Sequence, residues 1–211
     1  MGDGDMTVLD AQLAPRKVPK QQRAQFTVDC ILRAAESIIM KSGYDAANTN
    51  HIAEVAGVSI GSLYQYFSSK EAIAAALVEN AVINASEVLR DCLIENMAKP
   101  LEDSAQAIIE TILKTRKQYS FIFLRLPREV PKLGRLSRTV TTEKFLYHTI
   151  RAYYQQHRAE INVDDLEVAM FVSEHIIVGS IDAYLENNSP AITDEQLVQQ
   201  LSDAFVKYLT K

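Results

Sequence analysis

Residues 49–67 read TNHIAEVAGVSIGSLYQYF and decide the fold of the N-terminal part of the chain. Apolar residues recur at spacings of three and four on both sides of Gly57, which is typical of two short helices joined by a tight turn. The first helix is expected at about residues 50–56, with Ile52, Val55 and Ala56 on its apolar face. The second follows Ser59, whose hydroxyl can accept an orphan backbone N–H. The turn needs a residue that tolerates positive φ, and Gly57 meets that need.

This layout is that of a helix-turn-helix, in which the second helix lies in the major groove of DNA. We expect Ile52, Leu63 and Phe67 to fill the space between the two helices. The outer side of the second helix then carries small, polar or aromatic residues and no acid, so nothing on it repels phosphate. These outer residues are Ile60, Gly61, Ser62, Gln65 and Tyr66.

Helical periodicity continues through almost all of the remaining chain, and no segment alternates as a strand does. A helix is expected from Phe26 to Gly43, and another from Ser68 to about Met97, before Pro100. The second of these starts with Ser68-Ser69-Lys70-Glu71, which has the spacing of a capping box. Further helices are expected at 102–118, 120–130, 135–158, 164–187 and 194–209, the last begun by a capping box at Thr193-x-x-Gln196. The sequence therefore predicts an all-α fold.

The stretch from Thr49 to Phe67, continued by Ser69-Lys70-Glu71, resembles the DNA-binding signature of the TetR family of transcriptional regulators. The pattern Ile31-Leu32-x-Ala34-Ala35, ending in Gly43-Tyr44, agrees with it. The match is dense over about residues 26 to 75, and beyond them only length and helix count support it. The resemblance implies an N-terminal three-helix bundle with a helix-turn-helix and a larger C-terminal helical domain for dimerisation and ligand binding.

Three parts of the chain are expected on this basis. Residues 1–19 form a flexible basic arm, residues 20–70 the DNA-binding domain, and residues 71–211 the ligand-sensing and dimerisation domain. The charges agree with this division, although the whole chain carries a net charge of -5. Between residues 11 and 70 there are seven cations and four acids, whereas fifteen cations face twenty acids from residue 71 onward.

The resemblance also implies roles for individual residues in DNA binding. Thr49 and Asn50 are expected to meet phosphate, as are the phenols of Tyr64 and Tyr66 and the cation of Lys70. Gln65 and Ser62 are the candidates for base-edge hydrogen bonds, Ile60 for contact with a thymine methyl, and Gly61 for close approach of the helix backbone.

The C-terminal part is expected to form a homodimer and to bind a small-molecule effector. The helix from Asp164 to Asn187 is apolar nearly all the way round, so it has to be covered on more than one side. Together with the last helix, it can form a four-helix interface across a two-fold axis, where the resemblance also places the dimer. Aromatic residues and nearby polar groups could line an effector pocket, namely Tyr119, Phe123, Tyr147 and His175.

The predicted function is sequence-specific binding to a palindromic operator in double-stranded DNA, most readily as a repressor that an effector releases. A transcriptional activator and a helical small-molecule-binding protein without an operator are the alternatives. A serine hydrolase also has to be considered, because Gly57-Val58-Ser59-Ile60-Gly61 fits the Gly-x-Ser-x-Gly pattern. That pattern requires a preceding strand, whereas residues 52–56 have helical periodicity. We therefore expect no enzyme.

No metal site or cofactor is expected, because His148, His157 and His175 lack the paired spacing of zinc ligands. No stretch offers about 18 consecutive apolar residues, so we expect no membrane span. The first residues are acidic and no apolar segment follows them, so the sequence predicts a cytoplasmic protein.

Overall fold

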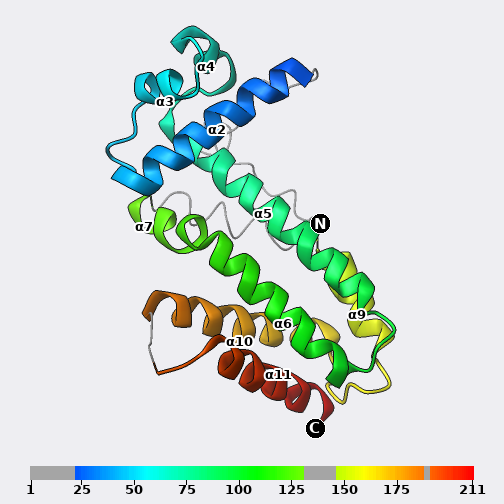
Figure 1. The fold of residues 1–211 in the computed structure, drawn as a ribbon. Helices are drawn as coiled ribbons and strands as arrows, with labels where there is room; N and C mark the ends of the chain where they lie inside the picture. The colour runs from blue at the N-terminus through cyan, green and yellow to red at the C-terminus, as the bar shows by residue number, and fades with distance from the viewer. Residues whose placement is uncertain (1–21, 131–145, 188–190) are drawn as a thin grey trace. The chain divides into compact units, whose positions relative to one another are not determined.

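The computed structural model describes residues 22–130, 146–187 and 191–211, and these residues form helices with no strand among them (Figure 1). The first elements are α2 (Gln22–Ser42), α3 (Thr49–Val55), α4 (Ile60–Tyr66) and α5 (Lys70–Glu95). They are followed by α6 (Leu101–Gln118), a π-helical turn η1 (Phe121–Arg125), α7 (Leu126–Glu129) and α9 (Tyr147–Gln156). The last two helices are α10 (Leu166–Asn187) and α11 (Asp194–Thr210). The all-α prediction is confirmed for these residues.

The chain divides into two compact units. Among the described residues, the first unit comprises 22–80 and 125–130, and the second comprises 81–124, 146–187 and 191–211. The helix α5 therefore contributes its first turns to one unit and its later turns to the other. The functional boundary expected near residue 70 stays a prediction, and the expected arm at residues 1–19 lies outside the described residues.

The first unit has a core to which its helices α2 to α5 and α7 all contribute. Ile31, Ala35 and Ile39 of α2 are at most 1% exposed, as periodic apolar spacing along one helix face requires. The seven residues of α5 from 72 to 78 are all buried, which identifies this part of α5 as a central helix. Leu126 of α7 is fully buried as well.

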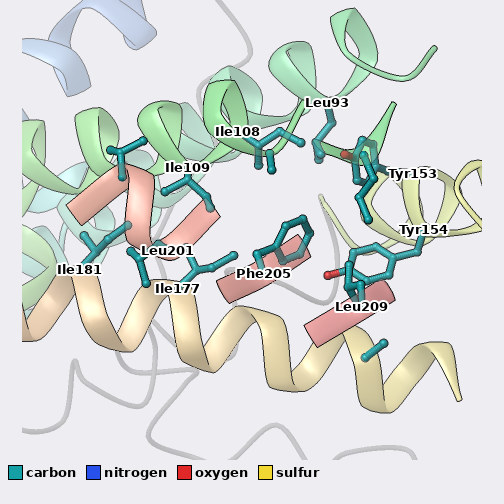
Figure 2. Close-up of a cluster of buried hydrophobic side chains, with 14 of the residues drawn as sticks. Leu93, Ile108, Ile109, Tyr153, Tyr154, Ile177, Ile181, Leu201, Phe205 and Leu209 are labelled. Atoms are coloured by element: carbon teal, nitrogen blue, oxygen red, sulfur yellow. The ribbon is translucent and has the colours of Figure 1, made fainter. Parts of the chain in front are cut away.

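The second unit buries one contiguous apolar cluster (Figure 2). The helix α11 packs against both α6 and α10, and α9 packs against α10. Aromatic rings contribute to this core, in which Tyr154 and Phe205 meet edge to face with ring centroids 6.3 Å apart. The labelled side chains are Leu93, Ile108, Ile109, Tyr153, Tyr154, Ile177, Ile181, Leu201, Phe205 and Leu209.

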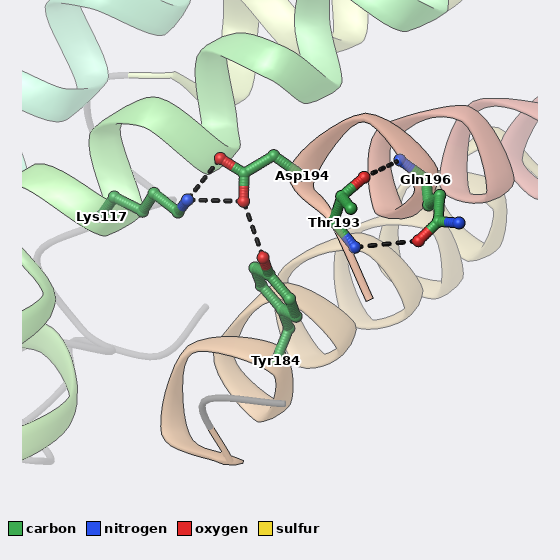
Figure 3. Close-up of polar contacts among 5 residues, drawn as sticks. All are labelled: Lys117, Tyr184, Thr193, Asp194 and Gln196. Carbon is green, nitrogen blue, oxygen red and sulfur yellow. Dashed lines mark hydrogen bonds and ion pairs between the residues drawn. The ribbon is translucent and has the colours of Figure 1, made fainter. Parts of the chain in front are cut away.

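Polar contacts tie the end of α6 to the last two helices (Figure 3). The ammonium of Lys117 donates to both carboxylate oxygens of Asp194, and the Tyr184 hydroxyl donates to Asp194 Oδ1 over 2.7 Å. The hydrogen bonds from Lys117 and Tyr184 lower the pKa of the Asp194 carboxyl. Arg116, the residue before Lys117 in α6, donates from its Nε to Asp182 Oδ1 of α10 over 2.8 Å. These contacts fix how α6 lies against α10 and α11.

Capping residues start the helices where the sequence predicts them. Thr193 and Gln196 form the expected capping box at α11, with bonds of 3.2 and 2.9 Å in the two directions. At α5, however, Ser69 rather than Ser68 caps the first turn, because its hydroxyl accepts the N–H of Ala72. Asp165 caps α10 by accepting the N–H groups of two residues of its first turn.

The helix expected at 120–130 is interrupted. Residues Phe121–Arg125 form a π-helical turn, and a short α-helix begins only at Leu126. Pro127 gives the physical reason, because it has no N–H to donate and its ring clashes with the carbonyl four residues earlier. Of the helix expected at 135–158, only the part after residue 145 is described, and it runs from Tyr147 to Gln156.

Two of the described helices, α5 and α10, are long and apolar enough to cross a membrane by length and composition. Their apolar windows are 56% and 28% buried inside the structure, respectively. Packing therefore accounts for much of the apolar surface of α5. The helix α10 leaves an apolar face uncovered, on which Val168, Phe171 and Ile176 are 49, 61 and 37% exposed.

The edge-to-face pair in the second unit predicts a large effect of truncation. Phe205→Ala removes a side chain that is 5% exposed and leaves a cavity beside Tyr154. We expect the free energy of unfolding to fall by about 3 to 5 kcal/mol in urea titrations at fixed protein concentration. Ile94→Ala, at a position 57% exposed, is the matched control and should cost well under about 1 kcal/mol. Equal losses in the two variants would contradict the assigned core.

Candidate DNA-binding surface

The turn between α3 and α4 is held by the backbone. Gly57 has φ +67°, and its N–H donates to the carbonyl of Glu54 over 3.1 Å. The N–H of Val58 then reaches back to the carbonyl of Ala53 over 3.0 Å. A Cβ at Gly57 would meet nothing within 4 Å, so the left-handed backbone, rather than crowding, demands glycine here.

The helix α4 begins at Ser59, as the sequence predicts. The Ser59 hydroxyl accepts the N–H of Ser62 over 3.0 Å and lies 2.8 Å from the Ser62 hydroxyl. Ser59 therefore satisfies an orphan donor of the first turn. Helices lie on both sides of the turn that contains it, so the strand that a nucleophile elbow needs is not there.

Two faces of α4 have opposite character. Leu63 and Phe67 are 0% and 1% exposed, and they lie in the same core as Ile52, which is 0% exposed. The expected packing between the two helices is thus confirmed. On the other face Ile60 and Tyr64 are 38% and 42% exposed, and Gly61 and Gln65 are exposed too. Ser62 and Tyr66 lie between the faces and are half-buried.

A hydrogen bond between side chains joins the start of α3 to the middle of α4. The hydroxyls of Thr49 and Tyr64 lie 3.0 Å apart. Both residues are expected to contact phosphate, and the structure brings them together at one edge of the exposed surface. Asn50 is exposed beside Thr49. The neighbouring His51 lies 3.8 Å from the carboxylate of Glu54.

Lys70 has a partner that the sequence does not reveal. Its ammonium donates to the backbone carbonyl of Tyr44 over 3.0 Å and lies 4.0 Å from the centroid of the Tyr44 ring. Tyr44 is only 7% exposed, and burial raises the pKa of its phenol above the usual range. Lys70 thus holds the loop that precedes α3. The hydrogen bond to Tyr44 uses one of the three N–H donors of its ammonium, so two others remain for a phosphate contact.

The residues expected to line an effector pocket do not form one group in the structure. Tyr119 and Phe123 meet edge to face at 6.0 Å, and the guanidinium of Arg116 lies 4.7 Å from the Phe123 ring centroid. The hydroxyl of Tyr147 instead donates to Glu167 over 2.8 Å. His175 lies on exposed α10 surface, with its ring 4.0 Å from that of Phe171. Their roles stay predictions.

Because Ser59 caps α4, its substitution should lower the stability of the protein without abolishing DNA binding. Ser59→Ala leaves the N–H of Ser62 without its acceptor, so we expect the free energy of unfolding to fall by about 1 kcal/mol. DNA binding should persist, because Ser59 carries none of the proposed contacts. Urea unfolding, DNA titration and an ester-hydrolysis assay check this, and an esterase activity that disappears in the variant would contradict the assigned role.

Comparisons with known proteins agree with this geometry. Residues 31–77 match the family model for bacterial regulatory proteins of the tetR family. The HTH-type transcriptional regulator SAR0097 of Staphylococcus aureus (strain MRSA252) is 23% identical over 190 residues, which cover 89% of this chain and 96% of that protein. That protein is described as a regulator of transcription.

Solved structures share the fold along most of the chain. A TetR-family protein from Mesorhizobium loti MAFF303099 has a TM-score of 0.71 at 18% identity, covering 89% of this chain and 96% of that one. RolR in complex with its ligand resorcinol has a TM-score of 0.56 at 16% identity, covering 89% of each chain. On these findings residues 31–77 resemble the DNA-binding region of the tetR family, the rest of the chain shares the fold of such proteins, and together they support a DNA-binding transcriptional regulator.

Proposed function

We propose that the protein is a cytoplasmic homodimeric repressor, which binds a palindromic operator through α4 and leaves it when a small-molecule effector binds. The observation that carries the proposal is the two-sided α4. Its buried face is anchored by Leu63 and Phe67, and its exposed face contains no acidic residue. A rigidly held helix of this kind can enter the major groove without repelling phosphate.

The exposed residues divide by the kind of DNA contact that they offer. Gln65 carries both a donor and an acceptor, and it is the proposed reader of a base edge, with Ile60 against a thymine methyl and Gly61 letting the backbone approach. The Ser62 hydroxyl also serves, provided that it turns away from Ser59. Phosphate contacts are assigned to Thr49, Asn50, Tyr64, Tyr66 and Lys70, and these fix the register rather than the sequence.

Dimerisation is proposed through α10 and α11. Val168 and Phe171 of α10 are exposed on one face, and Gly179 and Ala183 continue this face with small residues that permit close approach. The opposite face, with Ala169, Ser173, Ile177 and Ile181, is buried inside the second unit. On α11 a second stripe of exposed or half-buried residues consists of Leu197, Ala204 and Tyr208. Two copies of these faces fit the four-helix interface of a two-fold dimer.

Effector control follows from that dimer. One α4 contacts few base pairs, so useful affinity needs two copies at the spacing of the half-sites. A small molecule that binds the second unit only in a wrongly spaced state lowers DNA affinity by its differential affinity for the two states. We propose that the effector binds near Tyr119 and Phe123, and that Tyr147 and His175 are further candidates for contacts with it. The ligand complex of RolR supports a small-molecule effector on this fold.

The experiment that tests the proposal is a fluorescence-anisotropy titration at several salt concentrations. It compares the DNA upstream of the protein's own gene with a random duplex of equal length. We expect tighter binding to the upstream DNA and a salt dependence that reports the phosphate contacts. Equal affinity for both duplexes at every salt concentration would favour a helical small-molecule-binding protein without an operator.

Substitutions in α4 and at Lys70 should act differently on specificity and on salt dependence. We expect Gln65→Ala to lose about 1 to 3 kcal/mol of discrimination at one base pair and to leave binding to random DNA unchanged. We expect Lys70→Ala to weaken binding to every sequence and to reduce the salt slope by about one. Tyr66→Phe serves as a control without loss of charge, and it should weaken binding to all sequences at an unchanged salt slope. Equal losses of Gln65→Ala on specific and random DNA would refute its role.

If the exposed face of α10 forms the dimer interface, a charged residue placed on it should leave the protein monomeric. Phe171 is 61% exposed in one chain, so Phe171→Asp should leave the fold of that chain intact while disfavouring an apolar interface. Sedimentation velocity should then show a monomer, and the affinity for upstream DNA should fall at least about 100-fold because one half-site is lost. Ile94→Asp, on an exposed face of α5, is the matched control. A Phe171→Asp protein that stays dimeric would contradict the proposed interface.

A further inference from the structure

The carboxylate of Glu129, the last residue of α7, reaches a loop 85 residues earlier in the chain. Its Oε2 accepts the backbone N–H of Tyr44 over 2.9 Å. The preceding helix α2 ends at Ser42, where the N–H of Gly43 closes the last turn by donating to the carbonyl of Ile39. At Gly43, whose φ is +83°, the chain leaves the helical path, and the N–H of Tyr44 donates to Glu129 instead of to a carbonyl of α2.

Electrostatics alone do not explain this placement. A carboxylate beside the C-terminus of a helix is disfavoured by the helix dipole. Arg125 offsets this disadvantage, since its Nε lies 3.4 Å from Glu129 Oε1. On the other side, Lys70 donates to the carbonyl of Tyr44. Both polar groups of the Tyr44 backbone are thus held by charged side chains from two different helices, α5 and α7.

Holding Tyr44 fixes the loop that leads into the helix-turn-helix. The carbonyl of Tyr44 also accepts the N–H of Ala47 over 3.1 Å. Directly after it, Asn48 caps α3 by accepting the N–H of His51 over 2.9 Å. The position of α3 therefore depends on Tyr44, and that of α4 depends on α3 through the tight turn at Gly57.

Glu129 itself stands on a fixed element. Leu126, which begins α7, and Val130, which follows it, are 0% and 8% exposed. The residue lies outside the segment 31–77 that matches the family's DNA-binding model. We propose that Glu129 is a positioning residue for DNA binding, which does not touch DNA but holds the Tyr44 loop and with it the orientation of α3 and α4.

The test compares three variants of the full-length protein on the upstream duplex and on a random duplex. Removing a negative charge by itself strengthens binding to DNA. Glu110→Ala, at an exposed glutamate of α6, is the control for this charge effect and should bind as tightly as the natural protein or more tightly. We expect Glu129→Ala to bind both duplexes about tenfold more weakly, in the opposite direction. Glu129→Gln keeps an acceptor oxygen and should restore affinity to within about threefold.

Hydrogen exchange of the Tyr44 amide gives a readout that does not depend on DNA. Its protection should fall at least about tenfold in Glu129→Ala and persist in Glu129→Gln, while the protection of the amides of α11 in the second unit stays unchanged. The inference is overturned if Glu129→Ala follows Glu110→Ala in affinity, if Glu129→Gln loses as much affinity as Glu129→Ala, or if the Tyr44 amide exchanges equally in all proteins. Should the natural protein fail to bind either duplex, the assigned DNA function fails, and the exchange measurement still decides the role of Glu129.

Discussion

The packing of Leu63 and Phe67 into the core around Ile52, across a turn that only glycine makes without strain, is the constraint on which the DNA-binding surface depends. Because these three side chains are almost completely buried, α4 has one rotational setting about its axis. That setting presents Ile60, Gly61, Tyr64 and Gln65 to solvent. The same burial that stabilises the first unit therefore selects the residues available to DNA.

In the second unit, burial likewise separates one face of a helix from the other. Its helix α10 is apolar on nearly every side, yet only one of its faces is buried in the core of a single chain. We propose the other face as the contact with a second copy. The polar contacts from Arg116 and Lys117 hold α6 to α10 and α11 within each copy.

The features that depend on residues close together in the sequence were predictable. The turn at Gly57, the cap at Ser59 and the capping box at Thr193 each depend on neighbours within three or four residues, and all are confirmed. Val55 shows the limit of periodicity, since the sequence predicts it on the apolar face of α3 whereas it is 51% exposed. On a helix of seven residues, two apolar positions suffice to anchor one face, and a third can point to solvent.

Long-range contacts could not be predicted from spacing. Nothing in the sequence near Lys70 or Glu129 indicates that both hold the backbone of Tyr44, because such contacts arise only when helices far apart in sequence pack together. The contact of Tyr147 with Glu167, apart from Tyr119 and Phe123, has the same origin. The proposed DNA contacts of the individual α4 residues stay predictions for a related reason, since they depend on a partner molecule.

Hydroxyl-radical footprinting of the full-length protein on the DNA upstream of its gene tests the central claim most directly. Two identical α4 helices held by one dimer should protect two patches that are related by a dyad and lie on one face of the duplex, a whole number of helical turns apart. A single protected patch, or two patches on opposite faces of the duplex, would contradict the account.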